Sequence, residues 1–403
     1  MSTKLKKTIL IIISIIAIAV IALFIYAYFE SRNNGKTIPQ TIVDIFPHSS
    51  NVENPPPPVD TGTGTGQATS TPPVTDTFQT DYINRLRRIS DTPVTGGIFS
   101  STSTVRYVDK ATGNVYEYSY FNNTSRKITN TSIPKIYDSH WINKDVFVGR
   151  YLDTDNETIR SFVATIQNPG EKGTVSTVFL PPNITSIVAS PNKSSFFYIQ
   201  KDASNANGVI YNLKTENSSI VALLPNDEFR AVWNDNGLYV ETNSSYELSG
   251  YVFKISQSGG DLSYIIGPVA GLSTFPIPGG LTLSSFQKNV ASYFYDEKTH
   301  KYTKLSEVIV PEKCALGKTM LYCATNTDTS KEGFPDTWYR GDISSTDTVL
   351  KINLSDPNDI KQEFTPLVTD IEFDMTRPSI ADDEKTIIFI NKKDSYLWSL
   401  DLY

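Results

Sequence analysis

The stretch SIADDEKTIIFINKKDSYLWSLDLY occupies residues 379–403 and decides the fold. Its apolar runs are separated by one acidic and one polar turn, which is the pattern of three consecutive antiparallel strands. Three strands leave an open edge at the end of the chain, and folded proteins protect such edges. The stretch therefore predicts that a fourth strand from elsewhere in the sequence completes this sheet.

The same pattern recurs along the chain. Each copy has an apolar residue, a turn rich in Asn, Asp, Gly or Pro, and a strongly apolar strand, followed by a third strand and in most copies a fourth. The copies begin with GIFSSTSTVRYV (97–108), HWINKDVFVGRY (140–151), VASPNKSSFFYI (188–199), AVWNDNGLYVET (231–242), TFPIPGGLTLSSF (274–286), KCALGKTMLYCA (313–324) and PSIADDEKTIIFI (378–390). Seven units in about 310 residues give roughly 44 residues per unit, the length of a propeller blade.

The missing strand is predicted at NRLRRIS (84–90), directly before the first copy. This segment matches the fourth strands of the other units, and its pairing with YLWSLDL (396–402) would close the ring. A short helix over residues 83–89 is the alternative. The predicted fold class is an all-β, seven-bladed β-propeller that spans residues 81–403.

The turn sequences resemble degenerate copies of the P-x-W-S-P-D-G-K repeat of TolB-like, WD-repeat-type propellers. The segments TRPSIADDEKTIIFI (376–390), SPNKSSFFYI (190–199) and VWNDNGLYV (232–240) carry most of the resemblance, although Trp stands at the expected place only at Trp141 and Trp233. The overall plan is similar to membrane-anchored bacterial propellers of unassigned role. The resemblance covers about three quarters of the chain and implies a periplasmic scaffold or binding platform.

The amino-terminal region is predicted to attach the propeller to a membrane. Residues 1–7 are basic, and residues 8–29 contain no charged side chain. As a helix, residues 8–29 would rise about 33 Å, enough for a hydrocarbon core of roughly 30 Å. The lysines predict a cytoplasmic amino terminus; a cleaved signal peptide is the alternative. Residues 30–80, rich in Pro, Thr and Gly, predict a flexible stalk.

The two cysteines, Cys314 and Cys323, flank a predicted hairpin. A turn centred on Lys318 and Thr319 would place them opposite each other, close enough to form a disulfide. Two buried free thiols are the alternative. A disulfide agrees with a propeller outside the cytoplasm.

Composition removes several classes of function. The formal net charge of −7 argues against nucleic acid as a partner, because phosphate binding needs a basic surface. The chain has 3 histidines, no G-x-S-x-G motif and no phosphate-binding glycine loop. We therefore predict no catalytic residue, no metal site and no cofactor.

One acidic run resembles the start of a calcium loop. It contains Asp153, Asp155 and Glu157. The glycine and the distal glutamate of such a loop are missing, so a solvated turn is expected.

The sixth unit contains a long insertion at residues 325–347, between its second and third strands. Trp338, Tyr339 and Arg340 are adjacent there, and these residue types are enriched at interface hot spots. They are the predicted binding residues. In the alternative, Trp338 folds back to plug the central channel or cover the blade.

The leading hypothesis is a non-enzymatic module on a single-pass membrane anchor, which binds a protein or a cell-wall glycan outside the cytoplasm. One alternative is an extracytoplasmic hydrolase that acts on glycans with carboxylates in the central channel. Another is a structural subunit of a cell-envelope assembly. An enzyme requires clustered carboxylates of raised pKa in a pocket. A binding module requires an exposed patch of aromatic and Arg side chains, and a structural subunit requires a large apolar face.

Overall fold

The computed structural model describes residues 85–403, except 156, 171, 257–259, 288 and 367–371. These residues belong to the second of the two units of the chain, Thr75–Tyr403. The predicted anchor at 8–29 and stalk at 30–80 lie outside the described residues. Within the described part of the chain, no helix is long and apolar enough to cross a membrane.

The described residues form seven four-stranded antiparallel sheets, or blades. Blade 1 contains β2 (Val94–Ser101), β3 (Thr104–Asp109), β4 (Val115–Ser119) and β5 (Thr124–Lys127). Blade 2 contains β6 (Ile136–Asn143), β7 (Val146–Leu152), β8 (Ile159–Gln167) and β9 (Thr174–Phe179). Blade 3 contains β10 (Ile184–Ala189), β11 (Ser195–Lys201), β12 (Ala206–Asn212) and β13 (Asn217–Leu224). Blade 4 contains β14 (Phe229–Asn234), β15 (Gly237–Thr242), β16 (Ser249–Ile255) and β17 (Leu262–Ala270).

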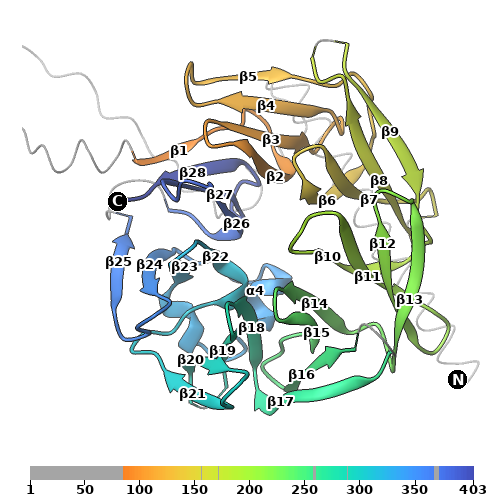
Figure 1. Ribbon diagram of the computed structural model, residues 1–403. Coiled ribbons are helices and arrows are strands. Elements are labelled where there is room, and N and C mark those ends of the chain that lie inside the picture. Colours follow the sequence, from red (N-terminus) through yellow and green to blue (C-terminus); the bar gives the residue numbers. More distant parts are fainter. Residues whose placement is uncertain (1–84, 156, 171, 257–259, 288, 367–371) are drawn as a thin grey trace, which may run out of the picture. The chain divides into compact units, whose positions relative to one another are not determined.

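The remaining blades follow the same plan, with one exception. Blade 5 contains β18 (Leu272–Ile277), β19 (Gly280–Ser285), β20 (Ala291–Asp296) and β21 (Lys301–Lys304). Blade 6 contains β22 (Cys314–Leu316), β23 (Met320–Thr325), β24 (Thr348–Asn353) and β25 (Ile360–Phe364). Blade 7 contains β26 (Met375–Ile380), β27 (Thr386–Asn391), β28 (Leu397–Asp401) and, from the other end of the propeller, β1 (Leu86–Arg88). Figure 1 shows the blades around a ring, with the first strand of each copy nearest the centre.

The ring closes where the first strand meets the last hairpin. β1 pairs with β28 in antiparallel fashion, with Leu86 opposite Leu400. The predicted pairing is therefore present, although the strand is shorter than residues 84–90. Arg85 strengthens the closure, because its Nε donates to the Asp401 carbonyl oxygen (2.8 Å) and its Nη1 to the Glu363 carbonyl oxygen of blade 6 (3.1 Å).

The core lies between neighbouring blades. On β11, the four consecutive side chains of residues 196–199 are at most 1 % exposed. Phe196 and Tyr198 pack against blade 2, whereas Phe197 and Ile199 pack against blade 4. Because successive side chains of a strand point to opposite faces, a strand covered on both faces has a continuous apolar run. This explains the sequence pattern by which the copies were identified.

The inner strands approach closely at the centre of the ring. A Cβ at Gly96 of β2 would lie 2.3 Å from the Ser139 carbonyl oxygen of β6, so a side chain there would clash with the backbone of blade 2. The hydroxyl groups of Thr95 and Ser139 are hydrogen-bonded at 2.9 Å. Arg377 of β26 pairs with Asp138 of β6 and donates to the Thr95 carbonyl oxygen at 3.1 Å. These contacts join blades 7, 1 and 2.

Candidate functional site

The insertion of blade 6 folds into two short helices. They are η2 (Thr327–Ser330) and α4 (Asp336–Arg340), and a third short helix, η1 (Pro311–Lys313), precedes β22. Gly341, with φ of 80°, ends α4 in the left-handed conformation that glycine adopts at little cost. Figure 1 shows α4 near the middle of the ring.

A buried cluster of charges attaches α4 to the blades. The Lys313 Nζ lies 2.7 Å from Asp374 Oδ1 and 2.8 Å from Asp347 Oδ2, and all three side chains are 0 % exposed. The indole Nε1 of Trp338 donates to Asp374 Oδ2 at 2.9 Å. The ammonium groups of Lys313 and Lys392 lie 4.7 and 4.2 Å from the centroid of the Trp338 ring. Because a buried charge without a partner is costly, these contacts fix the insertion in one position.

The two carboxyl groups of this cluster differ. Burial raises the pKa of Asp347, and the nearby Lys313 only partly opposes this. Burial also acts to raise the pKa of Asp374, but Lys313 and the hydrogen bond from Trp338 outweigh it, so this pKa is lowered. Contacts with Lys313 and with the Trp338 indole thus stabilise the ionised form of Asp374.

The structure separates the three predicted binding residues. Trp338 is 5 % exposed and packs against Phe286, Val310 and Phe334, so it is part of the core, as in the alternative of packing. Tyr339 is 41 % exposed, and its hydroxyl donates to Glu312 Oε1. Arg340 is exposed and pairs with Asp342 at 2.9 Å. The three residues therefore do not share one exposed patch, and of the three Tyr339 lines the cavity described next.

That cavity, here named the insertion cleft, has a volume of about 600 Å³. It lies between α4 and the loops at one end of blade 4. The lining residues that carry charge or expose apolar surface are Glu228, Arg230, Leu248, Glu312, Asp336 and Tyr339. Asp336 accepts a hydrogen bond from the backbone N–H of Tyr246 at 2.5 Å, which joins α4 to blade 4.

Carboxylates outnumber cations in the insertion cleft. Among the described residues that line it, Arg230 is the only basic one. Its Nε donates to Glu241 at 2.6 Å, and the Glu241 side chain is 2 % exposed. Burial raises the pKa of Glu241 although Arg230 opposes it, and burial together with Glu312 raises that of Tyr339. Because Glu241 balances Arg230, the other carboxylates give the cleft a negative potential.

The predicted disulfide is confirmed. Cys314 of β22 and Cys323 of β23 are opposite each other in the hairpin and bonded. The bond follows Lys313 directly in the sequence. It joins β22 to β23, the two strands that lead from Lys313 to the insertion.

The acidic run at blade 2 forms a local turn. Asp155 accepts hydrogen bonds from the backbone N–H groups of Glu157 and Thr158, both at 2.9 Å, and Asp153 pairs with Arg160 at 2.8 Å. In the described part of the chain, no group of three or more His, Cys, Asp or Glu could hold a metal ion.

The sequence pattern did not identify Glu228, Arg230 or Glu312 as site residues. They come from blade 4 and from η1, and only the closed ring brings them together. One signal existed: Arg230 and Glu241 are paired across the hairpin of β14 and β15. Opposite charges at such a position of a predicted hairpin indicate a cross-strand ion pair.

Comparisons with known proteins support the fold. No protein-family model and no curated protein matches the sequence. The β-propeller domain of the Trilobed protease from Pyrococcus furiosus is 11 % identical with a TM-score of 0.50, over 75 % of this chain and 93 % of that one. An oligogalacturonate lyase in complex with manganese is 10 % identical with a TM-score of 0.52, over 79 % and 93 %. TolB from Acinetobacter baumannii is more distant, at 9 % identity and a TM-score of 0.41, over 75 % and 78 %. At such identities the likeness is one of fold alone.

Proposed function

We propose that this chain is a non-enzymatic binding module, which a single-pass anchor holds on the outer side of a cell membrane. Its insertion cleft binds a basic segment of a protein partner. The observation that carries the proposal is the surplus of carboxylates beside the exposed ring of Tyr339, on an insertion fixed by buried charges. The disulfide supports the location outside the cytoplasm.

The chemistry of the cleft suits Lys and Arg side chains. The carboxylates of Glu228, Glu312 and Asp336 attract a cation, and the ring of Tyr339 offers a cation–π contact. Leu248, which is 63 % exposed, adds apolar surface for the aliphatic part of such a side chain. Charge complementarity of this kind gives an interface specificity and a fast association rate.

The alternatives have weaker support. A glycan hydrolase needs an accessible acid of raised pKa, but Glu241 is buried and bound to Arg230. A structural subunit needs one large apolar face, whereas the exposed apolar side chains are distributed over several blades, and many of them lie on outer strands. Examples of these side chains are Phe179, Ile220, Leu223, Tyr264 and Tyr302.

The test is a pair of substitutions in the full chain, Glu228→Lys and Tyr339→Ala. Proteins that co-purify from the native membrane are quantified for the wild type and the double variant. We expect at least one partner with a basic segment to be lost, with binding weakened by about 10- to 100-fold per substitution. Its binding to the wild type should also fall as salt rises.

The control is Glu157→Lys, an equal charge reversal at an exposed position of blade 2. It should leave the set of partners unchanged. If the double variant retains every partner of the wild type, the insertion cleft is not the binding site and the proposed function is wrong.

A further inference from the structure

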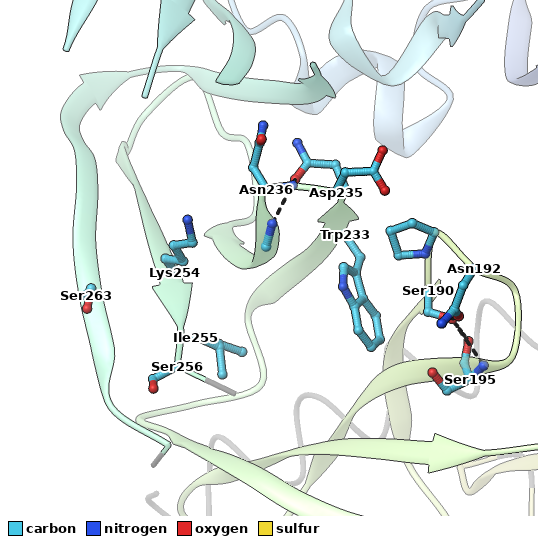
Figure 2. Close-up of a pocket in the computed structure, with 13 residues that line it drawn as sticks. Ser190, Asn192, Ser195, Trp233, Asp235, Asn236, Lys254, Ile255, Ser256 and Ser263 are labelled. Carbon is cyan, nitrogen blue, oxygen red and sulfur yellow. Dashed lines mark hydrogen bonds between the residues drawn. The ribbon is translucent and has the colours of Figure 1, made fainter. Parts of the chain in front are cut away.

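A second cavity lies at the other end of blade 4 (Figure 2). It has a volume of about 720 Å³, and we name it the Trp233 groove. Gly237, the first residue of β15, lines this groove, whereas Thr242, the last residue of β15, lines the insertion cleft. Because the two residues are at opposite ends of one strand, the cavities open at opposite ends of the blade.

Two rigid turns form the walls of the Trp233 groove. In the turn of blade 3, the Asn192 Oδ1 accepts hydrogen bonds from the Ser190 hydroxyl (2.8 Å) and the Ser194 backbone N–H (3.1 Å). In the turn of blade 4, the Asn234 Oδ1 accepts from the backbone N–H groups of Asn236 (2.9 Å) and Gly237 (3.1 Å). Side-chain oxygens that bond to their own turn hold it in one conformation, so the groove exists without a ligand.

An aromatic ring stands between these turns. Trp233 is only partly buried: it packs against the core between blades 3 and 4, and Figure 2 shows its indole ring between the turn of Asn192 and that of Asp235. The face of an indole ring carries partial negative charge, which attracts polarised C–H groups. Among the residues that line the groove, Trp233 supplies the aromatic ring.

The polar groups of the groove are amides and hydroxyls. In the part of the chain that the structure describes, the Nδ2 of Asn192 and the carboxylate of Asp235 make no hydrogen bond or ion pair, and both residues are exposed. The basic lining residue, Lys254, is already paired with Glu297. Ser195 and Ser263 add hydroxyl groups. The groove thus offers donors and acceptors beside an aromatic plane, without an unpaired cation that would select an anion.

We propose that the Trp233 groove binds an uncharged oligosaccharide. The C–H face of one pyranose ring stacks on the indole of Trp233, and neighbouring sugar hydroxyls bond to the Asn192 amide and the Asp235 carboxylate. The volume falls within the range of small-molecule sites, so it accommodates a few sugar residues. An apolar ligand would leave the amides and the carboxylate without partners.

The Trp233 groove shares no lining residue with the insertion cleft. It lies at a different end of blade 4 and is assigned a different ligand class. If both sites operate, one propeller binds a polysaccharide at one end and a protein at the other.

The experiment measures binding by ligand-observed NMR and calorimetry. The full chain is placed in lipid nanodiscs without glycosidic detergent, and the probes are maltohexaose, cellohexaose and chitohexaose. We expect at least one probe to bind saturably with a Kd below ~10 mM. Trp233→Leu, which keeps apolar packing but removes the aromatic face, should weaken that binding at least tenfold, by loss of a stacking contact.

Two further variants and a control make the result decisive. Asn192→Asp keeps the side-chain oxygen that holds its turn but removes the Nδ2 donor, and Asp235→Ala removes an exposed carboxylate, so each should weaken binding several-fold. Trp141→Leu removes the Trp at the corresponding place of blade 2 and should leave binding unchanged. The proposal is wrong if none of the three probes binds. It is also wrong if folded Trp233→Leu binds as tightly as the wild type. Should Trp233→Leu unfold, the proposal is wrong if Asn192→Asp and Asp235→Ala both bind as tightly as the wild type.

Discussion

Trp338 and Tyr339 are neighbours in the sequence and lie in different surroundings. Successive residues of a helix point about 100° apart, so one ring of α4 faces the core while the next borders the insertion cleft. The sequence identified the pair as binding residues from their type alone. It could not show which ring is buried, because the partner of the Trp338 indole, Asp374, is 36 residues away.

Asp138 is the residue whose charge should make stability depend on pH. Its side chain is 3 % exposed. Burial acts to raise its pKa, but His140, Arg377 and Arg150 together hold it well below 3.8. Since the pKa is lower in the folded state, Asp138 stabilises the fold above about pH 4 and loses this effect as the pH falls.

We therefore expect Asp138→Asn to lower the free energy of unfolding by about 3 kcal/mol at pH 7, because two guanidinium groups lose their carboxylate. This deficit should shrink as the pH is lowered towards 3. Urea unfolding at pH 7, 5 and 3 measures it. The control is Leu86→Ala, which changes no titratable group, so its loss of unfolding free energy should be the same at all three pH values. If the loss for Asp138→Asn is also independent of pH, Asp138 is not the source of the pH dependence.

At the scale of the elements, β22 is the weakest inner strand. It has only 3 residues, whereas the other inner strands of the ring have 6 to 8. The disulfide joins it to β23 over a sequence separation of 9 residues. A covalent link compensates for the few backbone hydrogen bonds of this hairpin.

We expect the double variant Cys314→Ala and Cys323→Ala to lose about 3 kcal/mol of stability, the value for a closed loop of about 10 residues. Alanine is used because both positions are buried. Urea unfolding of the double variant and of the reduced wild type should give similar midpoints. An unchanged midpoint in both would mean that the strand pairing alone holds the hairpin.

The elements differ in how far the sequence predicts them. Second strands such as β11 and β27 were recognisable, because burial on both faces requires continuous apolar runs. The helix α4 was not, because five residues cannot show an apolar period and its stability comes from contacts with Asp374 and Lys392. β1 was recognised only because the last sheet lacked a strand.

For the whole molecule, the ring is closed by the pairing of β1 with β28. Leu86 is buried together with Leu400 and Trp398 in the core between blades 6 and 7. We expect Leu86→Ala to lower the free energy of unfolding by about 2–5 kcal/mol, because it leaves a cavity at the closing pair. Urea unfolding measures this loss. The control is Arg88→Ala, a substitution at a neighbouring exposed position, which should change the free energy of unfolding by less than about 1 kcal/mol. Equal effects of both substitutions would show that β1 contributes little.

The arrangement of the whole propeller explains why the sites were harder to predict than the fold. Counting the repeats was sufficient for seven blades, since each copy has its own strands and turns. The insertion cleft and the Trp233 groove each combine residues of at least two blades, so their lining depends on how neighbouring blades pack. Trp233 was noted as part of a turn, but its exposure beside Asn192 follows only from the packing of blades 3 and 4.

The pairing of β1 with β28 also determines when the ring can close during synthesis of the chain. Arg87 and its partner Asp401 are separated by 314 residues, so a ribosome working at about 10 residues per second needs roughly half a minute between them. During that interval the nascent chain can assemble blades 1 to 6, while β1 waits without its neighbour and blade 7 does not exist. An incomplete chain therefore cannot close the ring, because β1 keeps an unpaired edge until β28 has been made.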